Sequence, residues 1–158
     1  MSDVGVRQFD DAVARLPALL DALKSAPGHR VAEHPHVTDG PGIYLFSDGE
    51  RPVYVGQSRK LRTRLRQHTG ATNRQNQASF AFNLAKREAA LAGVDVKRTR
   101  TLLEADPAFV PHFDAARAGV AAMTVRFIEL TDPIERTLFE VYAALALDTA
   151  EFNSFETH

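Results

Sequence analysis

The feature that most constrains the fold of this chain is a strand–turn–strand pattern followed directly by a basic helix. Residues 42–46 and 53–56 alternate between aliphatic and other side chains, and the turn formers of 47–49 lie between them. This pattern predicts a β-hairpin. A helix over about 60–68 follows, rich in arginine, so that within twenty-five residues the chain brings together aromatic, cationic and imidazole groups.

Two tyrosines in the hairpin are candidates for chemistry. Tyr44 and Tyr54 share one face if the other face is formed by the aliphatic residues Ile43, Leu45, Val53 and Val55. Directly opposed residues on neighbouring strands have Cβ atoms about 4.5–5.5 Å apart. Two hydroxyls would then meet at one scissile phosphate, where a nearby cation or metal-bound water would favour the ionised phenol. The alternative is that both are ordinary strand residues packed on a sheet.

The remaining pattern predicts an α+β fold. An amphipathic helix over 7–25 is followed by a loop over 29–39, a third strand is expected over 123–130, and a last helix runs over 133–147. Residues 71–121 form a helical insertion. We therefore expect a small three-stranded antiparallel sheet flanked by helices, with an N-terminal helix and this insertion.

The length of 158 residues fits one structural domain. We divide it into an N-terminal helix and loop over 1–40 and the functional unit over 41–158. Long apolar runs and a secretory signal are missing, so we expect a cytoplasmic protein with no membrane partner. The chain contains no cysteine, which excludes disulfides, thiolate metal sites and cysteine nucleophiles.

Positive charge is concentrated in one place although the net charge is −1. Five cations occupy eight residues, and four further basic side chains follow: Arg59, Lys60, Arg62, Arg64 and Arg66, then His68, Arg74, Lys86 and Arg87. Such segregation suits one phosphate-facing groove on an otherwise neutral body. The alternative is a solvated helix face.

Arg64 and His68 lie one helical turn apart and so project from the same side. A guanidinium can bind phosphate through two parallel hydrogen bonds and stabilise charge that develops in a transition state. His68 could donate to a phosphate or assist proton transfer, or could be a surface histidine after a basic run. The remaining cations are candidates for positioning a nucleic-acid backbone: Arg59, Lys60, Arg62, Arg66 and Arg74.

Glu140 is the most distinctive acidic residue. It is the only charge between Arg136 and Asp148, in a helical segment that is apolar on most sides. A carboxylate there needs compensation, which Mg²⁺ can supply because that ion usually takes one or two carboxylates, waters and a substrate phosphate. The alternative is a salt bridge to an arginine on a helix. Glu135 is a weaker second candidate, since an acid in the first helical turn is favoured by the helix dipole alone.

The ordered set of motifs resembles the GIY-YIG endonuclease superfamily. The elements are Gly42-Ile43-Tyr44, Tyr54-Val55-Gly56, Arg64, Glu140 and Asn153. The resemblance implies that the two tyrosines orient or activate water, that the arginine stabilises the phosphate, that the glutamate binds the metal and that the asparagine is structural. Gly42 and Gly56 would support the site. Two features depart from the family pattern: the second triad reads Tyr-Val-Gly, and the insertion is long.

This resemblance implies hydrolysis of DNA phosphodiester bonds with Mg²⁺ or Mn²⁺ and no small-molecule cofactor. Two alternatives remain open. The chain could be a non-catalytic nucleic-acid-binding module on the same fold, or a protein-interaction domain that docks a partner through residues 71–121. The preferred DNA structure, the choice between DNA and RNA, the biological role and the oligomeric state are not determined by the sequence.

Overall fold

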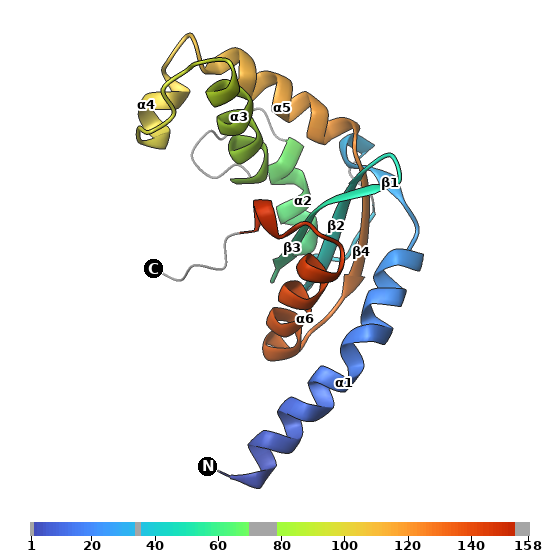
Figure 1. Ribbon diagram of the computed structural model, residues 1–158. Coiled ribbons are helices and arrows are strands. Elements are labelled where there is room, and N and C mark those ends of the chain that lie inside the picture. The colour runs from blue at the N-terminus through green and yellow to red at the C-terminus, as the bar shows by residue number, and fades with distance from the viewer. Residues whose placement is uncertain (1, 34–35, 70–78, 154–158) are drawn as a thin grey trace.

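The computed structural model describes residues 2–33, 36–69 and 79–153. Figure 1 shows its elements in chain order. They are α1 (Asp3–Ser25), β1 (His29–Arg30), the 3₁₀ turn η1 (Val31–Glu33), β2 (Gly42–Asp48), β3 (Arg51–Ser58), α2 (Leu61–Thr69), α3 (Ser79–Leu91), α4 (Arg100–Glu104), α5 (Val110–Ala122), β4 (Thr124–Glu129), α6 (Pro133–Ala146) and the 3₁₀ turn η2 (Ala150–Phe152).

The described strands form one antiparallel sheet in the order β1-β4-β2-β3. The α+β class is as predicted, but the expected count of three strands is wrong. The additional strand, β1, is two residues long and pairs His29 with Val125 and Arg30 with Thr124. Two residues are too few to show strand alternation, which is why the sequence predicts a loop there.

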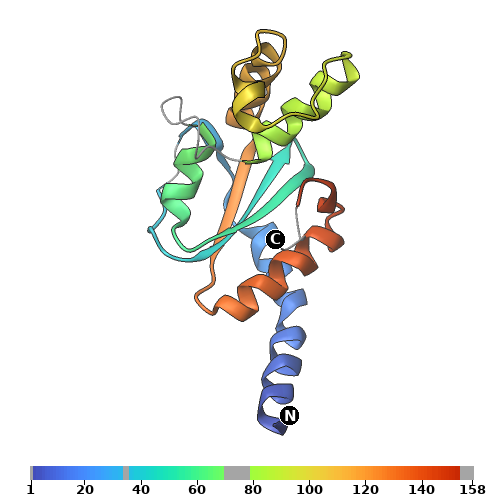
Figure 2. The same cartoon turned by 90° about the vertical axis from the view of Figure 1, so that its left-hand side faces the viewer.

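Helices cover both faces of the sheet (Figures 1 and 2). Helices α1 and α6 pack together on one face, and α2 lies on the other. Helices α3, α4 and α5 form a group at one end of the sheet, where α3 packs on α5. Three helices are thus described within the predicted insertion; residues 70–78 lie outside the described part.

The hairpin has an irregularity that changes one predicted side-chain direction. Phe46 pairs with Tyr54 and Ser47 with Pro52, so Val53 is an extra residue in β3. Val53 therefore packs in the core that contains Tyr44, and the prediction that it shares a face with Ile43 is wrong. Bulges of this kind leave no periodic signal in the sequence.

Two apolar cores lie on the two faces of the sheet. The core under α2, α3 and α5 contains both hairpin tyrosines, and its largest fully buried members are Tyr44, Phe46, Phe80 and Phe109. The core under α1 and α6 contains Phe139 together with aliphatic residues such as Ile43, Leu45 and Val55. The two tyrosines share a face as predicted, but they are diagonal neighbours, because the residue opposite Tyr44 is Gly56.

The last helix begins where its sequence predicts. The Asp132 carboxylate accepts hydrogen bonds from the backbone N–H groups of Ile134 and Glu135, at 2.9 and 2.8 Å, and Pro133 occupies the first turn. Capping fixes the start of α6 and hence the positions of the residues one and two turns later. Among the described residues, no helix has the length and apolar character needed to cross a membrane.

Gly56 and Gly119 offer a matched test of the hairpin packing. A Cβ at Gly56 would overlap the Tyr44 ring, whereas a Cβ at Gly119 in α5 would meet nothing within 4 Å. We expect Gly56→Ala to lower the free energy of unfolding by about 1–3 kcal/mol through overpacking. Gly119→Ala should raise it by roughly 0.5–1 kcal/mol, because alanine is the better helix former. Urea unfolding of both variants measures these changes; equal stabilities would contradict the packing of Tyr44 on Gly56.

Candidate active site

Tyr44 is the centre of a buried polar cluster. Its side chain is 0% exposed, and its hydroxyl lies 2.9 Å from Nε2 of His68. Nε of Arg64 donates to the same hydroxyl at 3.4 Å. Burial is the main cause that raises the pKa of Tyr44 far above its ordinary value. Tyr44 is therefore a neutral hydrogen-bonding group in this structure.

Tyr54 lies beside this cluster and nearer to solvent. Its ring centroid is 6.1 Å from that of Tyr44, and its side chain remains 9% exposed. Burial raises the pKa of Tyr54, the positive charge of Arg64 opposes that rise, and the Glu140 carboxylate adds to it. The pKa of Tyr54 is thus influenced by the charge of the arginine of α2 and by that of the glutamate of α6.

His68 is enclosed by aromatic rings. It is 2% exposed, and its ring centroid lies 4.7 Å from that of Phe46 and 5.4 Å from that of Tyr44. Nδ1 is buried and has no hydrogen-bond partner. The interpretation as a surface histidine is wrong, and direct donation to a phosphate does not fit a ring buried on all sides. Among the described residues its polar contact is the Tyr44 hydroxyl, so its influence on chemistry runs through that group.

Burial lowers the pKa of His68 from its ordinary value of 6.5 to about 3, and the nearby positive charge of Arg64 acts in the same direction. The ring is therefore neutral at physiological pH. The nitrogen near Tyr44 can either accept the phenolic proton or donate to the phenolic oxygen, depending on the tautomer.

Glu140 points toward the hairpin. Oε2 of its half-buried carboxylate accepts a hydrogen bond of 2.6 Å from Nε2 of Gln57, the residue that follows the Tyr-Val-Gly triad. Burial raises the pKa of Glu140, and the Gln57 hydrogen bond partly offsets that rise. The predicted alternative of a salt bridge is not seen, because Glu140 forms no ion pair with any cation in the described part of the chain.

Glu135 lies elsewhere. Its carboxylate accepts a hydrogen bond of 2.6 Å from Nε of Arg15 on α1, so it joins the two helices that cover the other face of the sheet. The structure therefore separates the two acids of α6 that the sequence singles out. Only Glu140 faces the tyrosine side.

Asn153 and Gly42 hold the elements around the site. Nδ2 of Asn153 donates to the backbone carbonyl of Val55 at 2.6 Å, on the free edge of β3. A Cβ at Gly42 would overlap the carbonyl of Ile128 and the side chain of Leu61, so glycine allows α2 to pack closely against the sheet. Both positions therefore fit the supporting role that the motifs indicate.

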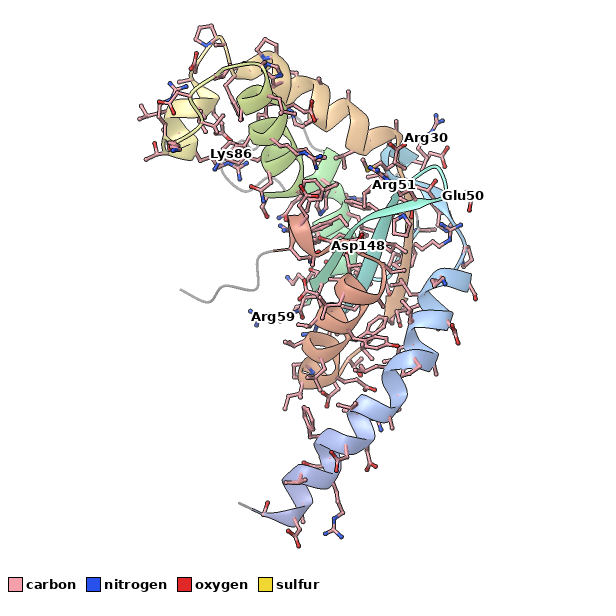
Figure 3. The ribbon with its side chains drawn as sticks, in the orientation of Figure 1. Arg30, Glu50, Arg51, Arg59, Lys86 and Asp148 are labelled. Atoms are coloured by element: carbon pink, nitrogen blue, oxygen red, sulfur yellow. The ribbon has the colours of Figure 1, made fainter. Side chains whose placement is uncertain are left out.

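The basic residues lie around the start of α2. Arg59, Lys60, Arg62 and Arg66 are exposed, and Figure 3 shows Arg59 pointing outward from the margin of the molecule. Arg74 lies outside the described residues. The exposed side chains of Arg59, Lys60 and Arg62 can be reached by a polyanion, whereas the guanidinium of Arg64 is half-buried against Tyr44.

Three supporting residues were not found from the sequence. Asp39 anchors α2, since its carboxylate accepts from the backbone N–H and the hydroxyl of Thr63 at 3.0 and 2.9 Å. Gln57 and Arg136 connect β3 with α6. The only available signal was that Gln57 continues the face of Val55, which places a polar side chain at the end of an apolar strand face.

The site fits a hard divalent cation that would take most of its ligands from water and from a substrate phosphate. The described residues contain no group of three or more potential ligands of the histidine, cysteine, aspartate or glutamate type. A site of one carboxylate matches the way Mg²⁺ binds, with waters and phosphate oxygens completing its shell, and does not match an all-protein zinc cage. Glu140 is the residue that would hold it.

The buried imidazole generates a pH prediction. The folded state favours neutral His68, so its contribution to stability is present above about pH 6.5 and is lost as the pH falls toward 3. As the pH falls through that window, the free energy of unfolding of the wild type should decrease by about 1.4 kcal/mol per pH unit more than that of His68→Phe. Urea unfolding at several pH values measures the difference. In the folded protein, the NMR chemical shifts of the His68 ring should remain those of a neutral imidazole down to pH 4. A His68 ring that titrates near 6.5 in the folded state would contradict this.

Comparison with known proteins identifies the part of the chain that carries the hairpin and α2. Residues 40–100 match the GIY-YIG catalytic domain. UvrABC system protein C of Aquifex aeolicus (strain VF5) is 50% identical over 32 residues, which are 20% of this chain and 6% of that protein. No solved structure matches the chain significantly. The resemblance that the motifs indicate is thus confirmed for the part of the chain that carries both triads and Arg64; Glu140 and Asn153 lie outside the matched residues.

Proposed function

We propose that this protein is a DNA endonuclease that hydrolyses phosphodiester bonds with the help of a divalent cation, Mg²⁺ or Mn²⁺. The observation that carries the proposal is the arrangement at the edge of β3. Arg64 of α2 contacts the Tyr44 hydroxyl, Tyr54 packs beside Tyr44 on the edge strand, and Gln57 of the same strand holds Glu140 of α6. The family match supports a nuclease-type activity.

Each residue of the site has a separate role in the proposed reaction. Arg64 is fixed by the Tyr44 hydroxyl and by Oε1 of Gln67, so its guanidinium is preorganised to stabilise negative charge on a phosphate. Tyr54, the tyrosine closer to solvent, orients the attacking water or accepts its proton. Tyr44 is fully buried and is better suited to position Arg64 than to act as a base. A divalent cation held by Glu140 would polarise the phosphoryl oxygen and stabilise the leaving oxygen.

The buried state of Tyr44 is also the observation that favours a second candidate, a non-catalytic DNA-binding module. A phenol and an imidazole sealed from solvent can serve packing alone. Nicking of supercoiled plasmid in Mg²⁺ or Mn²⁺, compared with EDTA, separates the two candidates. A panel of linear, branched and single-stranded substrates then identifies the preferred DNA structure.

Two glutamates on α6 provide a matched pair for the metal assignment. Glu140→Ala should abolish metal-dependent nicking, with a loss of at least about 10²-fold, because it removes the only carboxylate near Tyr54 in the described structure. Glu135→Ala removes an acid from the same helix but only breaks the contact with Arg15, so its nicking rate should stay near that of the wild type. Metal-dependent nicking retained by purified, folded Glu140→Ala would refute the assignment.

The exposed cations generate a prediction about salt. Arg59→Ala should weaken DNA binding on all sequences alike and reduce the slope of log affinity against log salt by about 0.9, if it neutralises one phosphate. Fluorescence anisotropy with a labelled duplex at several salt concentrations measures the slope. Arg51→Ala is the control, because Arg51 lies at the hairpin turn, away from α2. Binding that is insensitive to salt, or absent altogether, would instead favour a protein-interaction domain.

A further inference from the structure

Both polar atoms of the Gln57 side-chain amide form hydrogen bonds to one helix. Oε1 accepts from Nε of Arg136 at 3.2 Å, and Nε2 donates to Oε2 of Glu140 at 2.6 Å. Nε2 also lies 3.5 Å from the hydroxyl of Thr137. The three partners are on α6, so a single residue at the edge of the sheet contacts more than one turn of the helix that carries the acid.

Arg136 determines which way this amide points. Guanidinium groups have donors only, so the oxygen of Gln57 must face Arg136 and its NH₂ group must face Glu140. Arg136 is itself 6% exposed and is held by the backbone carbonyls of Leu130 and Thr131, to which it donates at 3.0 and 3.3 Å. A fixed cation thus removes the alternative orientation, in which two oxygens would face each other.

The carboxylate of Glu140 is left with one oxygen held and the other available. Oε2 accepts from Gln57, and Oε1 accepts no hydrogen bond from any of the described residues. Val55, on the same face of β3, already packs with Phe139 and Ala143 of α6, so apolar contacts join the strand to the helix without Gln57. The hydrogen bond between Gln57 and Glu140 lies farther along β3 than these apolar contacts.

We propose that Gln57 is a positioning residue that orients Glu140 for a divalent cation, and that Arg136 sets the orientation of Gln57. This inference rests on the proposed function, because it assigns a partner to the carboxylate that would hold the metal. Hydrogen bonds behind a ligand typically strengthen metal binding about 10–100-fold. The same contacts hold in place a carboxylate that forms no ion pair with any described cation.

The test uses the whole chain and Mn²⁺ alone. Paramagnetic broadening of NMR signals near Glu140, followed through a Mn²⁺ titration, gives the dissociation constant without any DNA cleavage. Gln57→Met keeps the length of the side chain but removes its hydrogen bonds, and we expect it to weaken Mn²⁺ binding about tenfold or more. Thr137→Val removes the long contact of Gln57 and leaves the Glu140 contact, so its affinity should match the wild type. Glu140→Ala defines the background.

The outcomes distinguish the inference from the function. A Glu140-dependent site that Gln57→Met leaves unchanged would overturn the positioning role and leave the endonuclease proposal standing. A wild type with no Glu140-dependent broadening would overturn both the positioning role and the metal assignment. If Gln57→Met does not fold, the NMR signals of the Gln57 side-chain NH₂ group provide the test. We expect these signals to shift when Mg²⁺ is added to the wild type, and to shift in Glu140→Ala. Signals that respond to neither change would overturn the inference.

Discussion

The packing of the Tyr44 ring across Gly56 is the contact on which the site depends. Since Gly56 has no Cβ, the ring can lie over β3 and bring its hydroxyl to Arg64 and His68 on α2. One aromatic side chain thereby connects two strands and a helix. Any larger residue in place of Gly56 would displace the Tyr44 ring. The guanidinium of Arg64 and the imidazole of His68 would then lose their shared hydrogen-bond partner, and a buried polar group without a partner is destabilising.

The position of β3 at the edge of the sheet allows both faces to contribute to one place. The tyrosines lie on the face that α2 covers, and Glu140 belongs to a helix on the opposite face. Side chains from opposite faces of a sheet can approach each other only around an edge strand. Asn153 satisfies a backbone carbonyl on this free edge, and Gln57 reaches from it to α6, so the edge is partly protected from pairing with another strand while access to the site is kept.

Local patterns predicted the elements but not the long-range contacts. The hairpin followed from alternation, and α6 followed from Asp132 and Pro133, because caps act within a few residues. Strand β1 was missed since its two residues depend on pairing with β4, and the direction of Val53 was wrong because a bulge shifts the register. Burial of His68 could not be read from a basic helix, because it results from rings on two other segments: Tyr44 and Phe46 of β2 and Tyr54 of β3.

In the proposed endonuclease, a metal site with one carboxylate makes the affinity for DNA and the affinity for the divalent cation depend on each other. With few protein ligands, a cation at Glu140 draws the rest of its shell from water and from the phosphate. The phosphate in turn is held by cations at the start of α2 and by Arg64. Each ligand then raises the affinity of the protein for the other by the same factor. A half-buried glutamate with a raised pKa suits such a device, because a bound cation favours its ionised form.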